Sequence, residues 1–161
     1  MTPKRPADPA VLVATVGGIG LIPIAPGTWG SLAAVPAGWL IVNVLGVAGL
    51  LAAIVAIFAL GVWASGRYAA RAGEHDPGSC VIDEVVGQLI VVAALPPDPW
   101  FLAGGFVMFR LFDIIKPWPA GLVDQRVPGG LGIMLDDVVA GLQAAAVMMV
   151  IVAILEHGGL P

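Results

Sequence analysis

The chain has 161 residues, of which 59% are hydrophobic and only 11% are charged, and its mean hydropathy is +0.99. Soluble domains carry roughly 25% charged residues, so this composition excludes an ordinary soluble protein and predicts a membrane protein with a single domain over residues 1–161. The net charge of −4 argues against a nucleic-acid partner, and the single cysteine excludes an internal disulfide.

The first apolar segment, residues 10–24, is shorter than the roughly 20 residues that a spanning helix needs. We expect a buried or re-entrant helix there. It is followed by the sequence Pro-Gly-Thr-Trp-Gly-Ser at residues 26–31, directly before a long apolar run, which is the pattern of a helix start. The free N–H groups of a helix N-terminus can bind phosphate, although a capped turn at the membrane surface explains the same residues.

The long apolar run, residues 32–66, contains no charged residue and is interrupted near Asn43 and Gly46. It is long enough for two helices, and we predict that they form a hairpin whose ends lie on the same side of the membrane. Arg67 and Arg71 follow the second helix. Basic residues beside short loops mark the cytoplasmic face, so both ends of the hairpin are expected there.

Two shorter apolar segments, residues 85–95 and 100–109, are joined by a proline-rich turn. Neither is long enough to cross a hydrocarbon core of about 30 Å, so we expect a partly inserted helical hairpin or the ends of tilted helices. The last apolar run, residues 138–155, is the best candidate for a spanning helix, with Asp136 and Asp137 at its cytoplasmic start. The predicted fold is therefore all-α: a compact multi-helix membrane protein with short or re-entrant helical hairpins and a C-terminal spanning helix.

We expect these helices to bring the charged residues between Arg67 and Asp137, apart from Asp98, to one membrane face. Burying a carboxylate costs several kcal/mol unless it is paired or bound to metal. Arg110 and Asp113 are explained equally well as a structural ion pair, and adjacent acidic residues as a helix cap. Taken together, however, the acidic residues, the cations and two glycine-rich helix starts favour a functional site. Carboxylates without catalytic Cys or His suit a hard cation such as Mg2+.

Four motifs occur in chain order. They are Pro26-Gly27-Thr28-Trp29-Gly30-Ser31; His75-Asp76 with Asp83-Glu84-x-x-Gly87; Arg110-x-x-Asp113-x-x-Lys116-Pro117-Trp118-Pro119; and residues 124–141, with Gly129-Gly130-Leu131-Gly132-Ile133-Met134 and Asp136-Asp137. In this order they resemble the bacterial phosphatidylglycerophosphatase A family over nearly the whole chain. The resemblance implies a Mg2+-dependent enzyme of the bacterial cytoplasmic (inner) membrane, with its site facing the cytoplasm. It implies hydrolysis of phosphatidylglycerophosphate to phosphatidylglycerol and phosphate in phospholipid synthesis.

The predicted site has two groups of residues. The metal ligands and the group that activates water are expected among five acidic residues: Asp83, Glu84, Asp113, Asp136 and Asp137. The substrate phosphate is expected to bind to Gly27, Thr28, Gly30, Ser31, Arg110, Lys116, Gly129 and Gly130. The sequence leaves open which carboxylate acts on water, whether one or two metals bind, and whether the protein forms a homo-oligomer.

Two other functions use similar residues. A small channel or carrier also contains intramembrane carboxylates and glycine-broken helices, but it usually places its charges near the middle of the membrane and shows an internal repeat. Here the charges lie at helix ends and no repeat is evident. Another lipid-headgroup enzyme, such as a phosphotransferase of the CDP-alcohol family, would carry an Asp pattern that this sequence lacks.

Overall fold

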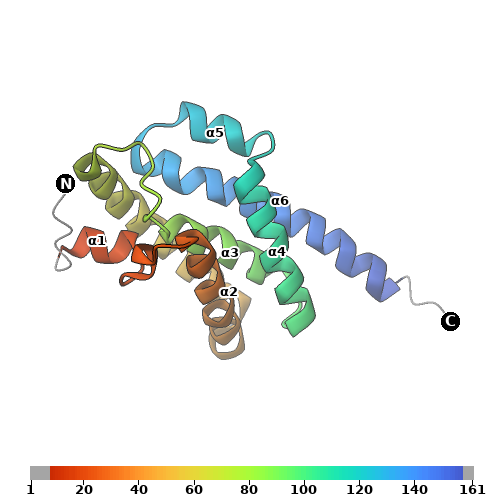
Figure 1. Ribbon diagram of the computed structural model, residues 1–161. Coiled ribbons are helices and arrows are strands. Elements are labelled where there is room, and N and C mark those ends of the chain that lie inside the picture. Colours follow the sequence, from red (N-terminus) through yellow and green to blue (C-terminus); the bar gives the residue numbers. More distant parts are fainter. Residues whose placement is uncertain (1–7, 158–161) are drawn as a thin grey trace.

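A computed structural model of the chain describes residues 8–157, and within that range the secondary structure is entirely helical (Figure 1). The predicted all-α fold is therefore confirmed. The elements are α1 (Pro9–Ala14), the short 3-10 helix η1 (Ile19–Leu21), α2 (Pro26–Ala72), α3 (Ile82–Ala94), α4 (Pro99–Ile115), α5 (Ala120–Arg126) and α6 (Gly129–His157).

Helix α2 is a hairpin with a break at Gly46, where φ is 71° and ψ is 178°. Gly30, in its first half, packs against Val81, and Gly61, in its second half, packs against Ile82. Both halves therefore reach the start of α3, and in Figure 1 the chain descends through the first half and returns behind it. The hairpin predicted over residues 32–66 is therefore confirmed. Its turn lies at Gly46 because only glycine readily adopts the backbone conformation found there.

Helices α3 and α4 form the second predicted hairpin. Gly105 of α4 lies against Val91 and Leu95 of α3, while Gly87 of α3 lies against Phe109 near the other end of α4, so the two helices are antiparallel. Asp98 caps α4 at the turn by accepting a hydrogen bond of 2.8 Å from the Trp100 N–H. The far end of α4 thereby returns to the start of α3.

The N-terminal segment differs from the prediction. One helix was expected over residues 10–24, but α1 ends at Ala14 and the chain turns before η1. Val16, Gly17 and Gly18 all have positive φ values in this turn. The two glycines permit a left-handed turn that stops the helix.

The start of the C-terminal helix also differs from the prediction. Helix α6 begins at Gly129 rather than at residue 138, so Asp136 and Asp137 lie within the helix and not at its N-terminus. The glycine-rich sequence before them forms the first turns of α6, and Gly130 packs directly against the α2 backbone at Val62 and Gly66. Tertiary packing therefore keeps these residues helical despite their low helix propensity.

Helices α2 and α6 are long and apolar enough to cross a membrane. Large apolar side chains are exposed along both, among them Val44 and Val55 in α2 and Val150 and Ile154 in α6. Exposed apolar surface on this scale marks a face that lipid or another apolar partner covers. Composition and exposed surface together indicate a membrane protein.

We expect Gly46→Ala to destabilise the α2 hairpin, because a side chain at this φ and ψ costs about 1–3 kcal/mol. Thermal unfolding in detergent measures the loss. Gly78→Ala is the matched control, since a Cβ at Gly78 meets nothing within 4 Å and its φ is not left-handed. Equal Tm values for the two variants would contradict the assigned role of Gly46.

Candidate active site

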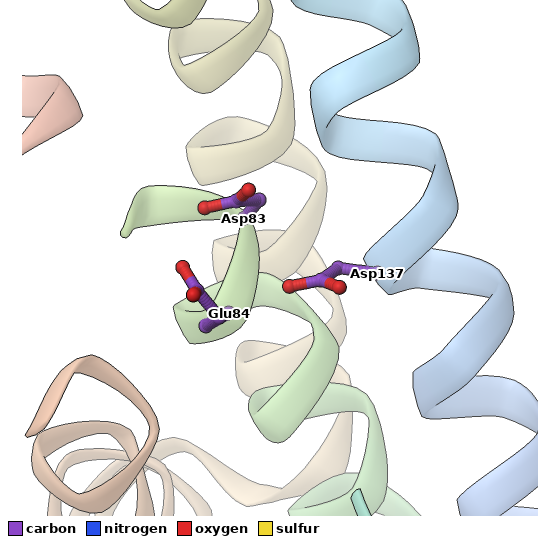
Figure 2. A group of neighbouring side chains, drawn as sticks. All are labelled: Asp83, Glu84 and Asp137. Atoms are coloured by element: carbon purple, nitrogen blue, oxygen red, sulfur yellow. The ribbon is translucent and has the colours of Figure 1, made fainter. Parts of the chain in front are cut away.

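Three carboxylates converge between α3 and α6. One oxygen from each of Asp83, Glu84 and Asp137 lies within 4.8 Å of the other two. Figure 2 shows Asp83 and Glu84 leaving the first turn of α3 and Asp137 projecting from α6 towards them. Asp83 is only 6% exposed and Asp137 only 2%. We call these three residues the acidic triad.

Close packing of two glycines holds the triad together. A Cβ at Gly141 of α6 would lie 2.5 Å from the Gly87 carbonyl oxygen, and a Cβ at Gly87 of α3 would lie 2.7 Å from the Asp137 carbonyl oxygen. Phe109 and the α6 backbone occupy the space beside Gly87. Glycine is needed there for helix packing.

The triad has buried oxygens without partners. Asp83 Oδ1, Glu84 Oε2 and Asp137 Oδ2 accept no hydrogen bond from the part of the chain that the structure describes. Leaving a buried carboxylate oxygen unsatisfied costs free energy, whereas a hard divalent cation takes such oxygens as ligands. The chemistry of this donor set therefore fits a divalent cation.

Burial also changes the acidity of the two carboxylates at the start of α3. It raises the pKa of Asp83 well above its usual range, and the neighbouring Glu84 raises it further. Burial raises the pKa of Glu84 to about 7, against the lowering effects of a hydrogen bond with Asp83 and of the Arg110 charge. Without a cation, negative charge at this position is therefore disfavoured.

The other two predicted acidic residues bind basic side chains. Asp113 Oδ2 lies 2.6 Å from the Arg110 guanidinium on the same helix, and Asp136 Oδ2 lies 2.6 Å from Lys116 Nζ. Asp136 Oδ1 also accepts a hydrogen bond of 2.9 Å from the Asp137 N–H. Both residues thus border the triad, where they form ion pairs with the side chains of Arg110 and Lys116.

Arg110 connects the triad to the start of α2. Its Nη1 lies 3.8 Å from Glu84 Oε1 and donates a hydrogen bond of 3.3 Å to Ser31 Oγ. Gly27 lies directly against Glu84 Oε1, so a larger residue there would displace the carboxylate. The structure thereby brings three predicted phosphate-binding residues, Gly27, Ser31 and Arg110, to the triad. Thr28 is half-buried in the same helical turn as Gly27.

The remaining glycines of the prediction pack helices. Gly30 lies against Val81, and Gly130 lies against the α2 backbone. Gly129 and Gly130 start α6 about 10–12 Å along the helix axis from Asp137, at 1.5 Å per residue. Phosphate binding by these glycines stays a prediction.

One polar residue near the site, Gln88, was not among the predicted site residues. Gln88 follows Glu84 by one helical turn and is fully buried, and neither its Nε2 nor its Oε1 has a hydrogen-bond partner among residues 8–157. It could have been identified from the sequence, because it is the one polar side chain within the apolar segment 85–95.

The sequence model of the phosphatidylglycerophosphatase A family matches residues 12–152. The chain belongs to this family. Membership confirms the predicted resemblance and makes the chain an enzyme, a phosphatase, rather than the channel or carrier considered above. No solved structure matches the chain significantly.

Named relatives cover most of the chain. It is 43% identical to phosphatidylglycerophosphatase A of Haemophilus influenzae, over 89% of each protein. It is 42% identical to phosphatidylglycerophosphatase A of Escherichia coli, over 88% of this chain and 83% of the relative. A third relative, from Bacteroides thetaiotaomicron, is 38% identical over 86% of this chain and 91% of its own, and its provisional name is phosphatidylinositol-3-phosphatase.

We expect Mg2+ to stabilise the protein more at pH 8 than at pH 5. In metal-free protein, Glu84 keeps its proton up to a pKa of about 7 when folded, against a usual value of 4.5. The folded state thus binds more protons than the unfolded state between these values, and stability falls as pH rises through them. A bound cation offsets the charge that causes this loss. Thermal unfolding with Mg2+ or with EDTA at both pH values measures the effect.

Glu84→Gln should weaken the Mg2+ response at pH 8, because it removes one charged ligand. Glu74→Gln is the matched control, since Glu74 is exposed and lies outside the triad. An equal Mg2+-induced rise in Tm for both variants would show that the cation binds elsewhere.

Proposed function

We propose that the protein is a Mg2+-dependent phosphatase that hydrolyses phosphatidylglycerophosphate to phosphatidylglycerol and inorganic phosphate in bacterial phospholipid synthesis. The observation that carries the proposal is the acidic triad next to Arg110, in which three buried oxygens have no hydrogen-bond partner in the described part of the chain. The names of the two relatives that are 42–43% identical support this substrate.

In this proposal Asp83, Glu84 and Asp137 hold Mg2+. When bound, the ion supplies positive charge that offsets both the carboxylates and the substrate phosphate. In this proposal a carboxylate of the triad takes the proton from the attacking water. Burial of these groups between α3 and α6 limits the bulk water around the reacting phosphate, which strengthens each electrostatic contact.

Arg110 and Lys116 bind the phosphate monoester, which carries a charge of about −1.5 to −2 near neutral pH. Arg110 lies next to the triad and has a buried Nε without a partner among the described residues, so it can donate to a phosphate oxygen. Asp113 orients the Arg110 side chain and Asp136 orients the Lys116 side chain through these ion pairs. Gly27, Thr28 and Ser31 complete this side of the site at the N-terminus of α2.

We also propose that the site faces the cytoplasm at the bacterial inner membrane. Arg67 and Arg71 end the second half of α2, on the side where α2 begins beside Glu84. Arg110 and Lys116 lie at the same end of the structure. An excess of basic residues marks the cytoplasmic side. Two further basic residues of this prediction, Lys4 and Arg5, lie outside the described residues.

The activity test is phosphate release from purified protein in detergent, with phosphatidylglycerophosphate as substrate. We expect turnover to require Mg2+ and to fall by about a hundredfold or more in Asp83→Asn and Asp137→Asn, because each change removes a charged ligand. Glu74→Gln should keep the wild-type rate. Near-normal rates for both Asn variants at saturating Mg2+ would reject the metal assignment. Faster hydrolysis of phosphatidylinositol 3-phosphate would instead favour the substrate named for the Bacteroides relative.

Arg110→Lys should lower turnover at every Mg2+ concentration, since a lysine ammonium cannot form the paired contacts of a guanidinium. Recovery of the full rate at high Mg2+ would show that Arg110 supports the metal ligands and not the phosphate.

The orientation is tested with Gly73→Cys, at the exposed end of α2. In intact cells this cysteine should resist a membrane-impermeant thiol reagent, and it should react after the membrane is opened. Cys80 is 3% exposed and burial raises its pKa to about 12, so it gives little background, and a Cys80→Ala background removes the rest. Rapid labelling of intact cells would place the site on the opposite face.

A further inference from the structure

An apolar groove of about 460 Å³ lies between the first half of α2 and α4. Leu32, Val35 and Trp39 form one wall, and Leu102, Ala103 and Phe106 form the other. No charged residue lines it. Its volume is within the roughly 300–1,000 Å³ of pockets that bind small molecules.

One end of the groove meets the candidate active site. Leu32 directly follows Ser31, and Phe106 precedes Arg110 by about one helical turn, while the Arg110–Ser31 hydrogen bond of 3.3 Å joins the two walls at this end. The groove then extends away from the triad towards Trp39 and the start of α4. In Figure 1 the first half of α2 and the lower end of α4 both extend below α3.

We propose that this groove binds one acyl chain of the lipid phosphate substrate. The inference rests on the proposed function and adds the position of the lipid tail to it. The lipid carries, in order, a phosphate monoester, a glycerol, a phosphodiester and the acyl chains. The protein presents, in matching order, the acidic triad, the Arg110–Ser31 pair and the apolar groove.

The single polar end distinguishes an acyl chain from other occupants. A ligand with an anionic head and a hydrocarbon tail satisfies Arg110 and the apolar walls together. A neighbouring apolar helix satisfies only the walls, and a bulk phospholipid lacks the terminal phosphate monoester that the triad end of the site would bind. In a membrane, holding a chain in the groove gains packing contacts but little hydrophobic free energy, because the surrounding lipid is equally apolar. The groove therefore acts mainly by positioning the headgroup.

Ala103→Trp tests the groove by filling it, since Ala103 is an exposed lining residue whose replacement removes no buried side chain. The substrates are two phosphatidylglycerophosphates with the same headgroup, one with oleoyl chains and one with butanoyl chains, in the same detergent. We expect kcat/KM for the long-chain substrate to fall roughly tenfold, equivalent to about 1.4 kcal/mol. The value for the short-chain substrate should stay within about twofold of wild type, because its chains occupy little of the groove.

Val107→Trp fills the same groove from a neighbouring position and should reproduce this selective loss. Ala56→Trp is the matched control, as it adds the same side chain to an exposed position of α2 outside the groove. It should change neither value.

Equal losses for both substrates in the groove variants would overturn the proposal, since they would indicate a distorted site. Unchanged values for both substrates would overturn it too, and would leave the groove to bulk lipid. In either case wild-type protein that hydrolyses both substrates retains the proposed function. If the wild-type protein hydrolyses neither substrate, both the proposed function and the assignment of an acyl chain to the groove are rejected.

Discussion

The close approach of α3 and α6 at Gly87 and Gly141 is the contact on which the candidate site depends. Each glycine lies so near the facing backbone that a Cβ would be within 2.5–2.7 Å of a carbonyl oxygen. Any larger residue would force the helices apart. Because Asp83 and Glu84 are fixed to α3 and Asp137 to α6, separation of the helices would also separate the three carboxylates. The packing of α3 against α6 therefore also fixes the geometry of the triad.

Charge is distributed around that contact in two ways. Asp113 and Asp136 form short ion pairs with Arg110 and Lys116, which satisfy these carboxylates and fix the positions of the cations. The triad, in contrast, keeps buried oxygens that accept no hydrogen bond from the described residues 8–157, an arrangement that costs stability. Buried carboxylates that destabilise the folded protein in this way are expected to serve a function such as binding a cation. The raised pKa of Glu84, about 7, expresses the same cost as a preference for the protonated form.

The two hairpins separate this polar end from an apolar remainder. The turn of α2 at Gly46 and the turn between α3 and α4 at Asp98 both lie away from the triad, while the start of α2, the start of α3 and the end of α4 lie beside it. Apolar side chains remain exposed along the intervening surfaces. A lipid substrate likewise has a polar head and apolar tails, so one molecule can contact the polar end of the protein and the adjoining groove at once.

The sequence by itself determined the all-helical class, the hairpin at Gly46, the proline-marked turn before α4 and the family, because these depend on local composition, chain-breaking residues and motif order. It also identified every carboxylate of the triad. Only the tertiary structure separated Asp83, Glu84 and Asp137 from Asp113 and Asp136, since it decides which carboxylates of α3 and α6 meet and which pair with Arg110 or Lys116. The start of α6 at Gly129 and the packing roles of Gly87 and Gly130 likewise depended on tertiary contacts. A glycine's local sequence gives the same signal whether it opens a loop, admits a ligand or lets two helices touch, and only the neighbouring helix decides which.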